Sequence, residues 1–314
     1  MAKILFLGLI AFYIIKVFVQ KNEDFEVVKS QLNLLLKPNN LIIICIILTL
    51  NFINWALEAV KWQVLVKPLE ELSFLASLKG VLAGLSLGFI SPANVGDMAG
   101  RMLTIKHKTR KRSFGAVFMG SSIQTYITLF FGTFAFGYFI FDVLPKASIL
   151  HLVIFSCLIL GILLGVILIQ ERQILSDLFL KTSWLNKLAL YFEIINLYST
   201  NTILKALWFG TLRYAVFTFQ FHLIFLVFQI QLPLPDSLMI INLIFLTKTI
   251  IPTFNFLTDL GVRQISALYF FSFYGVNHSV IMAAVFSIWL INILLPVLVG
   301  TGIILSSKFQ RIKL

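Results

Sequence analysis

The segment GLSLGFISPANVGDMAGR, residues 84–101, interrupts an almost continuous apolar sequence with a proline, an asparagine, an aspartate and an arginine. A second segment, PTFNFLTDLGVR at residues 252–263, repeats the interruption in the other half of the chain. Irregular polar backbone is tolerated at membrane depth only where protein or a water-filled cavity surrounds it, because lipid satisfies no donor or acceptor. The two segments therefore predict the substrate site of a membrane protein.

The overall composition indicates the same class of protein. Hydrophobic residues make up 59% of the 314 positions, charged residues make up 12%, and the mean hydropathy is +0.97. A soluble domain of that composition would lack polar coverage. We therefore expect an all-α polytopic integral membrane protein with a single membrane domain over residues 1–314. The formal charge of +12 lies in short loops beside apolar runs, where it reports orientation and not nucleic-acid binding.

Six apolar runs are long enough to cross a bilayer, which requires about 20 helical residues. The loop KHKTRKR, residues 106–112, holds five Lys or Arg and no acid, so it is predicted to be cytoplasmic. Alternation from that loop places both termini in the cytoplasm, in agreement with the basic C-terminal tail. The six runs are residues 4–20, 41–66, 114–140, 148–169, 203–228 and 278–306.

Two further stretches do not fit as crossings under this topology. Residues 73–104 are flanked on both sides by the cytoplasm, and residues 237–275 are flanked on both sides by the outside. Each stretch is therefore predicted to be a re-entrant helical hairpin, turning at Pro92 in the first case and at Pro252 in the second.

The order span, hairpin, span occurs twice, which predicts an inverted repeat with halves 41–140 and 203–306. Inverted repeats with broken helices at the midplane are common in transporters, where helix ends point at substrate or ions. Local sequence supports the pairing, because an aspartate and an arginine four residues apart follow the proline in both halves. The matching residues are Pro92, Asn94, Asp97 and Arg101, and Pro252, Asn255, Asp259 and Arg263.

The charged residues of these hairpins are candidate substrate-binding residues, because a charge in hydrocarbon costs about 2.5–3.5 kcal/mol on insertion scales. Asp97–Arg101 and Asp259–Arg263 have the i, i+4 spacing of an ion pair. Each pair either neutralises itself and holds its hairpin in place, or contacts a charged headgroup or a coupling ion. Lys248 lacks a nearby acid in sequence, so it reaches Asp97 or Asp259, binds an anion such as substrate phosphate, or extends to the outer interface. Arg213 is interpreted as an ordinary interface cation.

Small residues recur at every fourth position along the first limb of the first hairpin, which predicts close helix packing. The alternative is a groove that accepts a lipid tail or a moving helix. The small residues are Ala76, Gly80, Gly84 and Gly88.

Signatures of enzymes and metal sites do not occur in the sequence: there is no HExxH, Cys pair, P-loop, GxSxG or dinucleotide fingerprint. We therefore expect a protein that is not an enzyme and has no metal or cofactor. Two alternatives stay open. One is a non-transporting accessory subunit, and the other is an intramembrane enzyme that uses Asp97 or Asp259 as a general base.

Three stretches carry a resemblance to a known family. NWALEAVKWQVLVKPLE (54–70), SFLASLKGVLAGLSLGFISPANVGDMAGR (73–101) and IIPTFNFLTDLGVRQISALYFF (250–271) resemble the lysylphosphatidylglycerol synthase transmembrane family. This family is the flippase-like membrane region of bacterial aminoacyl-phospholipid synthases. The resemblance extends from about residue 41 onward.

The family's first break reads Pro, then Gly-Glu, then Arg, and the resemblance assigns these positions to Pro92, Gly96, Asp97 and Arg101. The second break reads Gly-x-x-Glu in the family. Here Gly261 is followed by Gln264, which keeps hydrogen bonding but loses the charge. Asp259 would then replace the missing carboxylate.

The resemblance implies movement of a lipid with a polar or charged headgroup, such as an aminoacylated phospholipid, between leaflets of the bacterial cytoplasmic membrane. A polyprenyl-phosphate-linked sugar is an alternative cargo. Because no soluble synthase domain follows the membrane region before Leu314, lysyl transfer is not expected of this chain. The implied partners are membrane lipids and a lipid-modifying or glycosyl-transferring enzyme.

Overall fold

The fold is all-α throughout the part of the chain that the computed structural model describes, and no strand occurs there. Five helices in that part are long and apolar enough to cross a membrane, so the predicted multi-pass protein is confirmed. They are Pro38–Val66, Ser113–Val143, Ile149–Gln170, Thr200–Val227 and His278–Ser306. The sixth predicted crossing, residues 4–20, lies outside the described residues. Those are residue 31 and residues 33–91, 95–106, 108–170, 194–251 and 256–306.

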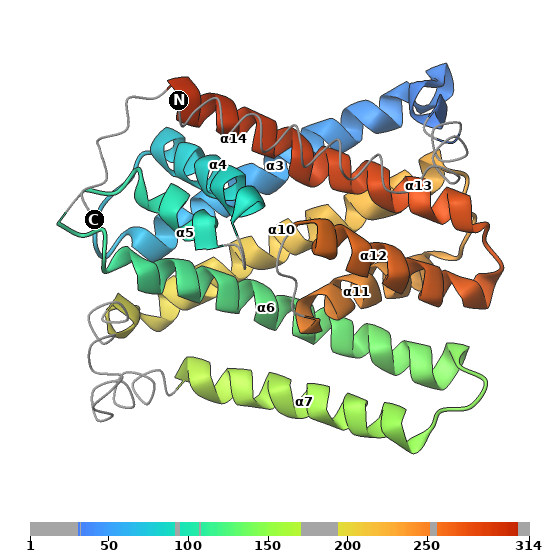
Figure 1. Cartoon of the computed structure of the whole chain (residues 1–314). Coiled ribbons are helices and arrows are strands. Elements are labelled where there is room, and N and C mark those ends of the chain that lie inside the picture. The colour runs from blue at the N-terminus through green and yellow to red at the C-terminus, as the bar shows by residue number, and fades with distance from the viewer. Residues whose placement is uncertain are drawn as a thin grey trace.

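Four long helices follow the predicted apolar runs to within three residues at each end. Helix α10 begins where Ser199 accepts a hydrogen bond from the backbone N–H of Thr202, as an N-cap serine should. Helices α3 and α10 pack against each other (Figure 1). The bounds are Leu41–Val66 for α3, Ser113–Tyr138 for α6, Ile149–Gln170 for α7 and Thr200–Val227 for α10.

The last crossing is an interrupted helix. It consists of α13 (His278–Trp289), a π-helical turn η6 (Leu290–Leu294) and α14 (Leu295–Ser306). Pro296 has no N–H to donate to the carbonyl of Asn292 four residues earlier, so regular α-helical bonding fails at this turn. Such π turns commonly mark functional positions in long helices.

Two shorter helices occupy the first predicted hairpin: α4 (Phe74–Ile90) and α5 (Val95–Met102). A methyl group added at Gly100 would overlap the backbone of Gly84, and one added at Gly96 would overlap Leu87. Later residues of α5 thus contact earlier residues of α4, so the two helices are antiparallel and their backbones touch.

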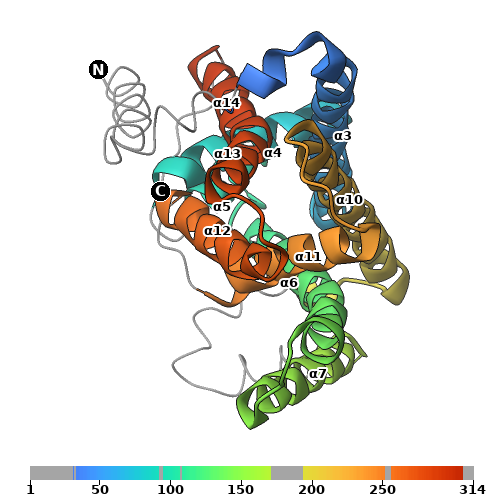
Figure 2. The ribbon, with the colours of Figure 1, turned by 90° about the vertical axis from the view of Figure 1, so that its right-hand side faces the viewer.

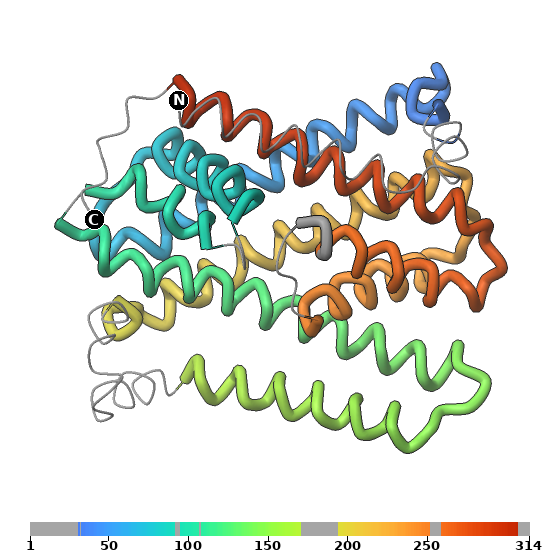
Figure 3. Tube along the Cα trace, in the orientation of Figure 1, coloured from blue at the N-terminus to red at the C-terminus, as the bar shows by residue number. Residues whose placement is uncertain are grey.

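The second predicted hairpin also holds two antiparallel helices, α11 (Leu234–Ile250) and α12 (Phe256–Phe271). Lys248, near the end of α11, contacts Asp259 near the start of α12. At the other end of the pair, Tyr274 Oη donates a hydrogen bond of 2.8 Å to Asp236. The pair α4–α5 lies toward one end of the bundle and α11–α12 toward the other (Figures 1 and 3).

Each of these helix pairs packs against the last crossing of the other half. Helix α4 contacts α14 at Gly300, where a methyl group would overlap Leu82, and Ser86 Oγ donates a 2.7 Å hydrogen bond to Val297 O. Helix α11 contacts α6 at Gly132, which lies against Leu246. The contacts are reciprocal between the two halves.

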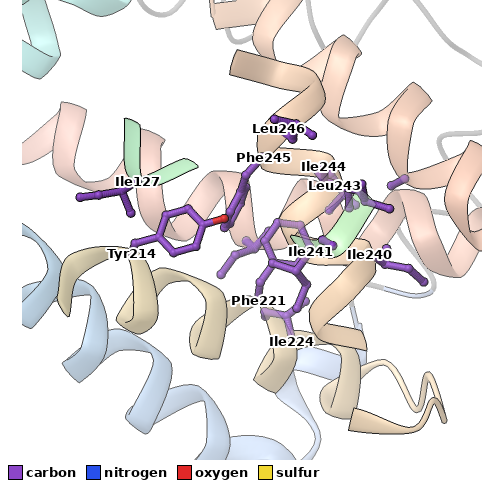
Figure 4. Close-up of a cluster of buried hydrophobic side chains, with 14 of the residues drawn as sticks. Ile127, Tyr214, Phe221, Ile224, Ile240, Ile241, Leu243, Ile244, Phe245 and Leu246 are labelled. Atoms are coloured by element: carbon purple, nitrogen blue, oxygen red, sulfur yellow. The ribbon is translucent and has the colours of Figure 1, made fainter. Parts of the chain in front are cut away.

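The apolar core includes residues of most of the described helices, and one part of it lies between α10 and α11. Their side chains interleave, with Phe221 and Ile224 of α10 against Ile240 and Ile241 of α11 (Figure 4). In contrast, α7 lies to one side of the bundle, packs along α6 and keeps most of its surface exposed (Figure 2). The polar site described next is built from α3, α5, α6, α10, the π turn η6 and the α11–α12 pair, and no residue of α7 lines it.

Candidate functional site

A stripe of polar residues follows one face of the otherwise apolar helix α3. Its members are spaced three or four residues apart, so they share a face. They are Asn51, Asn54, Glu58 and Lys61, and none is more than 5% exposed. Buried charges are costly unless they are paired, so this stripe requires partners from other helices.

Glu58 is the centre of a buried ionic cluster that joins three helices. Its carboxylate lies 2.8 Å from Lys61 Nζ, 3.0 Å from Arg101 Nη1 of α5, and 3.4 Å from Arg213 Nε of α10. One carboxylate thus holds three cations in place. Asp97 adds a second acid, at 3.0 Å from Arg101 Nε.

Aromatic rings support the two arginines. The guanidinium of Arg101 lies 5.6 Å from the ring centre of Trp62, and that of Arg213 lies 5.2 Å from Trp55. Both distances are in the range of cation–π attraction. Arg213 also donates a hydrogen bond of 3.1 Å to Gln124 Oε1 of α6. The arginines are therefore fixed in position on more than one side.

A second, smaller cluster belongs to the α11–α12 pair. Arg263 Nε lies 2.9 Å from Asp259 Oδ2, and Lys248 Nζ lies 3.5 Å from Asp259 Oδ1. The guanidinium of Arg263 lies 5.9 Å from the ring centre of Phe217 on α10. Both predicted i, i+4 ion pairs therefore form, and Lys248 pairs with Asp259.

The two clusters face one cavity of about 450 Å³. Five cations, from both halves of the chain, line it: Lys61, Arg101, Arg213, Lys248 and Arg263. Their acids are Glu58, Asp97 and Asp259, which leaves two formal positive charges in excess. Within the described ranges, no three His, Cys, Asp or Glu side chains lie close enough to hold a metal ion. The cavity is suited to an anion.

The predicted site residues are distributed unevenly around this cavity. Asp97, Arg101, Lys248 and Arg263 line it, and Asp259 lies behind them as an ion-pair partner. Gln264 does not line it, because its amide donates a hydrogen bond of 3.0 Å to the carbonyl of Met282 on α13. Four predicted residues lie outside the described part of the chain: Pro92, Asn94, Pro252 and Asn255.

The predicted glycines also differ in role. Gly80 and Gly84 face the α5 segment at close range, as the small-residue pattern predicts, and Gly88 is buried in α4. Gly96 contacts the backbone of Leu87. At Gly261, in contrast, an added methyl group would meet nothing within 4 Å among the described residues. Close backbone packing is thus a property of the first helix pair.

Three charged residues of the site were not predicted from the sequence to belong to it: Glu58, Lys61 and Arg213. The interpretation of Arg213 as an interface cation is wrong, because it lines the cavity and pairs with Glu58. The signal for Glu58 and Lys61 was present, since polar residues at positions 51, 54, 58 and 61 share one face of an apolar helix.

Comparison with known proteins identifies the family to which the chain belongs. Among curated proteins and among solved structures, the chain has no match. The family model described as the lysylphosphatidylglycerol synthase TM region matches residues 2–300, nearly the whole chain. That family is associated with lipid modification and lipid flipping, and no soluble synthase domain is evident in the match. The chain therefore belongs to the lysylphosphatidylglycerol synthase transmembrane-region family.

Proposed function

We propose that this protein moves lipids with a phosphate-bearing polar headgroup between the two leaflets of the membrane. The observation that carries the proposal is the cavity of about 450 Å³ lined by five cations, with an excess of two positive charges over their acids. Charges of this kind are rare inside membrane proteins and mark substrate pathways. The family's association with lipid flipping supports the same function.

In this proposal the pairs α4–α5 and α11–α12 are re-entrant hairpins of an inverted repeat, with halves 41–140 and 203–306. Support comes from their antiparallel packing at opposite ends of the bundle. Further support is the reciprocal contact of α4 with α14 and of α11 with α6. Transporters with inverted repeats place their sites between the two halves, and here each half contributes cations to the cavity.

The headgroup phosphate would enter the cavity while the acyl or prenyl tails stay in the bilayer. Arg101, Arg213 and Lys248 would attract the phosphate, and Arg guanidinium groups suit its geometry. Glu58 and Asp97 would keep the cations apart from one another and oriented between transport events. The excess positive charge favours an anionic headgroup, which includes a polyprenyl-phosphate-linked sugar as well as a phospholipid.

Orientation in the membrane is part of the proposal. The basic loop at residues 106–112 supports a cytoplasmic position for the end of the bundle that holds α4 and α5. The membrane would be the bacterial cytoplasmic membrane, with both termini inside. The α11–α12 pair would then open toward the outer face.

The test is lipid transfer by the purified protein in liposomes. Fluorescent phosphatidylglycerol in the inner leaflet is protected from dithionite, and the wild-type protein should expose it. Lys248→Gln and Arg101→Gln should slow transfer at least tenfold, because both cations line the cavity. Lys205→Gln is the matched control, since Lys205 is exposed on α10 and does not line it.

Two outcomes would contradict the proposal. One is transfer by the wild-type protein no faster than in protein-free liposomes. The other is unchanged transfer by Lys248→Gln. Lys248 keeps a 38% exposed side chain, so its loss should leave a folded protein even where Arg101→Gln does not. Size-exclusion profiles and melting temperatures in detergent identify variants that fail to fold.

A further inference from the structure

The cavity has a second, uncharged polar region beside its cations. Asn54 of α3 and Asn292 of the π turn η6 both line the cavity, and both are at most 2% exposed. Neither amide atom of Asn292, nor Oδ1 of Asn54, has a hydrogen-bond partner in the part of the chain that the structure describes. Buried polar groups are nearly always hydrogen-bonded in proteins, so these amides require an explanation.

The π turn places Asn292 at this position. Asn51, one turn before Asn54 on α3, donates a hydrogen bond from Nδ2 to the carbonyl of Ile291. That bond fixes the turn against the polar stripe of α3, next to Asn54. Asn292 follows Ile291 directly, and its amide lies at the cavity wall.

The spacing between the two regions matches one headgroup. Glu58, the centre of the cation cluster, lies four residues beyond Asn54 on α3, which is about one helical turn or ~6 Å along the axis. A phosphate held by the cations would place groups attached through its ester oxygen within reach of the amides. An asparagine amide both donates and accepts hydrogen bonds, which complements a hydroxyl group.

We propose that Asn54 and Asn292 form a subsite for the hydroxyl groups of the headgroup, and that the cavity selects an anionic phosphodiester carrying a neutral, hydroxylated group. Glycerol and sugar headgroups meet this description. A headgroup that carries amino cations does not, because it adds positive charge to a cavity that already has two in excess. This inference rests on the proposed function and specifies its substrate class.

The test compares two lipids of equal charge. Dioctanoyl phosphatidylglycerol carries two headgroup hydroxyls and dioctanoyl phosphatidylethanol carries none, and each has one negative phosphodiester. Binding in detergent is measured by tryptophan fluorescence, because Trp55 and Trp62 line the cavity. We expect the wild-type protein to bind phosphatidylglycerol about tenfold more tightly, as one or two net hydrogen bonds would produce. Lysyl-phosphatidylglycerol should bind more weakly than phosphatidylglycerol.

Single-residue variants distinguish a loss of headgroup binding at the subsite from a loss of folding. Asn292→Ala and Asn54→Ala should each weaken phosphatidylglycerol binding about five- to tenfold and leave phosphatidylethanol within twofold. Asn51→Ala is the matched control, because Asn51 contacts the same π turn but does not line the cavity, so it should leave the ratio of the two affinities unchanged. If Asn292→Ala does not fold, Asn54→Ala alone decides.

Equal affinity of the wild-type protein for the two lipids would overturn the subsite, and so would an equal loss for both lipids in the asparagine variants. Tighter binding of lysyl-phosphatidylglycerol than of phosphatidylglycerol would overturn the charge preference. Loss of the subsite leaves the proposed function standing, provided that fluorescent phosphatidylglycerol still crosses in liposomes. Failure of both lipids to bind, together with no transfer, would remove both proposals.

Discussion

The two short helix pairs, α4–α5 and α11–α12, are held together in different ways. In α4–α5 the backbones themselves touch, since a methyl group at Gly100 would overlap Gly84. In α11–α12 the ion pair between Lys248 and Asp259 joins the two helices, and Gly261 has open space around it among the described residues. Backbone contact leaves no room for adjustment, whereas side chains have alternative rotamers. The first pair is therefore the more rigid of the two.

The ion pairs of the two helix pairs also differ, because those of the first pair connect it more firmly to the rest of the bundle. Arg101 of the first pair shares Glu58 with α3 and α10, so the pair is tied to two long helices by buried ions. Arg263 of the second pair is bonded to Asp259 within its own helix and rests on an aromatic ring of α10. The first pair is thus part of a fixed frame, and the second carries its own ion cluster. This difference predicts unequal responses to matched substitutions.

The largest effect is expected from loss of the shared carboxylate. Glu58→Gln would leave Lys61, Arg101 and Arg213 with Asp97 as the remaining acid, and removal of one partner of a buried ionic group costs about 3–5 kcal/mol. Asp259→Asn leaves only two cations, and Lys248 is exposed enough to reach water. We therefore expect a larger fall in the free energy of unfolding for Glu58→Gln, measured by reversible unfolding in mixed detergent micelles.

Glu71→Gln provides the baseline for that comparison, because Glu71 is 82% exposed and its pair with Lys67 lies on the surface. Its unfolding free energy should match that of the wild-type protein. An Asp259→Asn variant that loses as much stability as Glu58→Gln would show that the two clusters carry equal weight, against the asymmetry argued above.

The next largest effect on stability is expected at the contact between Gly100 of α5 and Gly84 of α4. Gly100→Ala must push α5 away from the backbone of α4, and overpacking of this kind typically costs about 1–3 kcal/mol. Gly261→Ala, in the middle of α12, should be neutral or stabilising by about 0.5–1 kcal/mol, because alanine favours a helix over glycine. Melting temperatures in detergent should therefore move in opposite directions or differ by several degrees. Equal melting temperatures would mean that α5 adjusts freely on α4.

Much of this difference between the two helix pairs could not be predicted from the sequence. Apolar runs and basic loops predicted the crossings, because span length and hydropathy are local properties. The Asp–Arg spacing of four predicted both ion pairs for the same reason. The spacing did not reveal that Glu58 would meet Arg101 and Arg213, since those contacts join residues 43 and 155 positions apart along the chain.

The resemblance between the two breaks also concealed their differences. Gly96 precedes Asp97 in the first break and Gly261 follows Asp259 in the second, and of these two glycines Gly96 alone lies against another backbone among the described residues. Which glycine is crowded depends on the helix that packs over it, and that helix comes from elsewhere in the chain. Local sequence therefore predicted where the chain breaks, whereas tertiary packing determines whether the glycine at each break contacts another backbone.

The smallest effect concerns Gln264, which the sequence predicts to be a substrate-binding residue but which faces α13 instead of the cavity. Gln264→Met removes the hydrogen bond to Met282 O, and hydrogen bonds between membrane helices contribute about 0.6–1.5 kcal/mol. Gln264→Glu removes the same donor and adds a charge. Both variants should lose a few degrees of melting temperature and keep wild-type affinity for phosphatidylglycerol. Faster lipid transfer by Gln264→Glu at unchanged stability would instead mean that this side chain turns into the cavity during transport, and that the second helix pair moves as its looser packing allows.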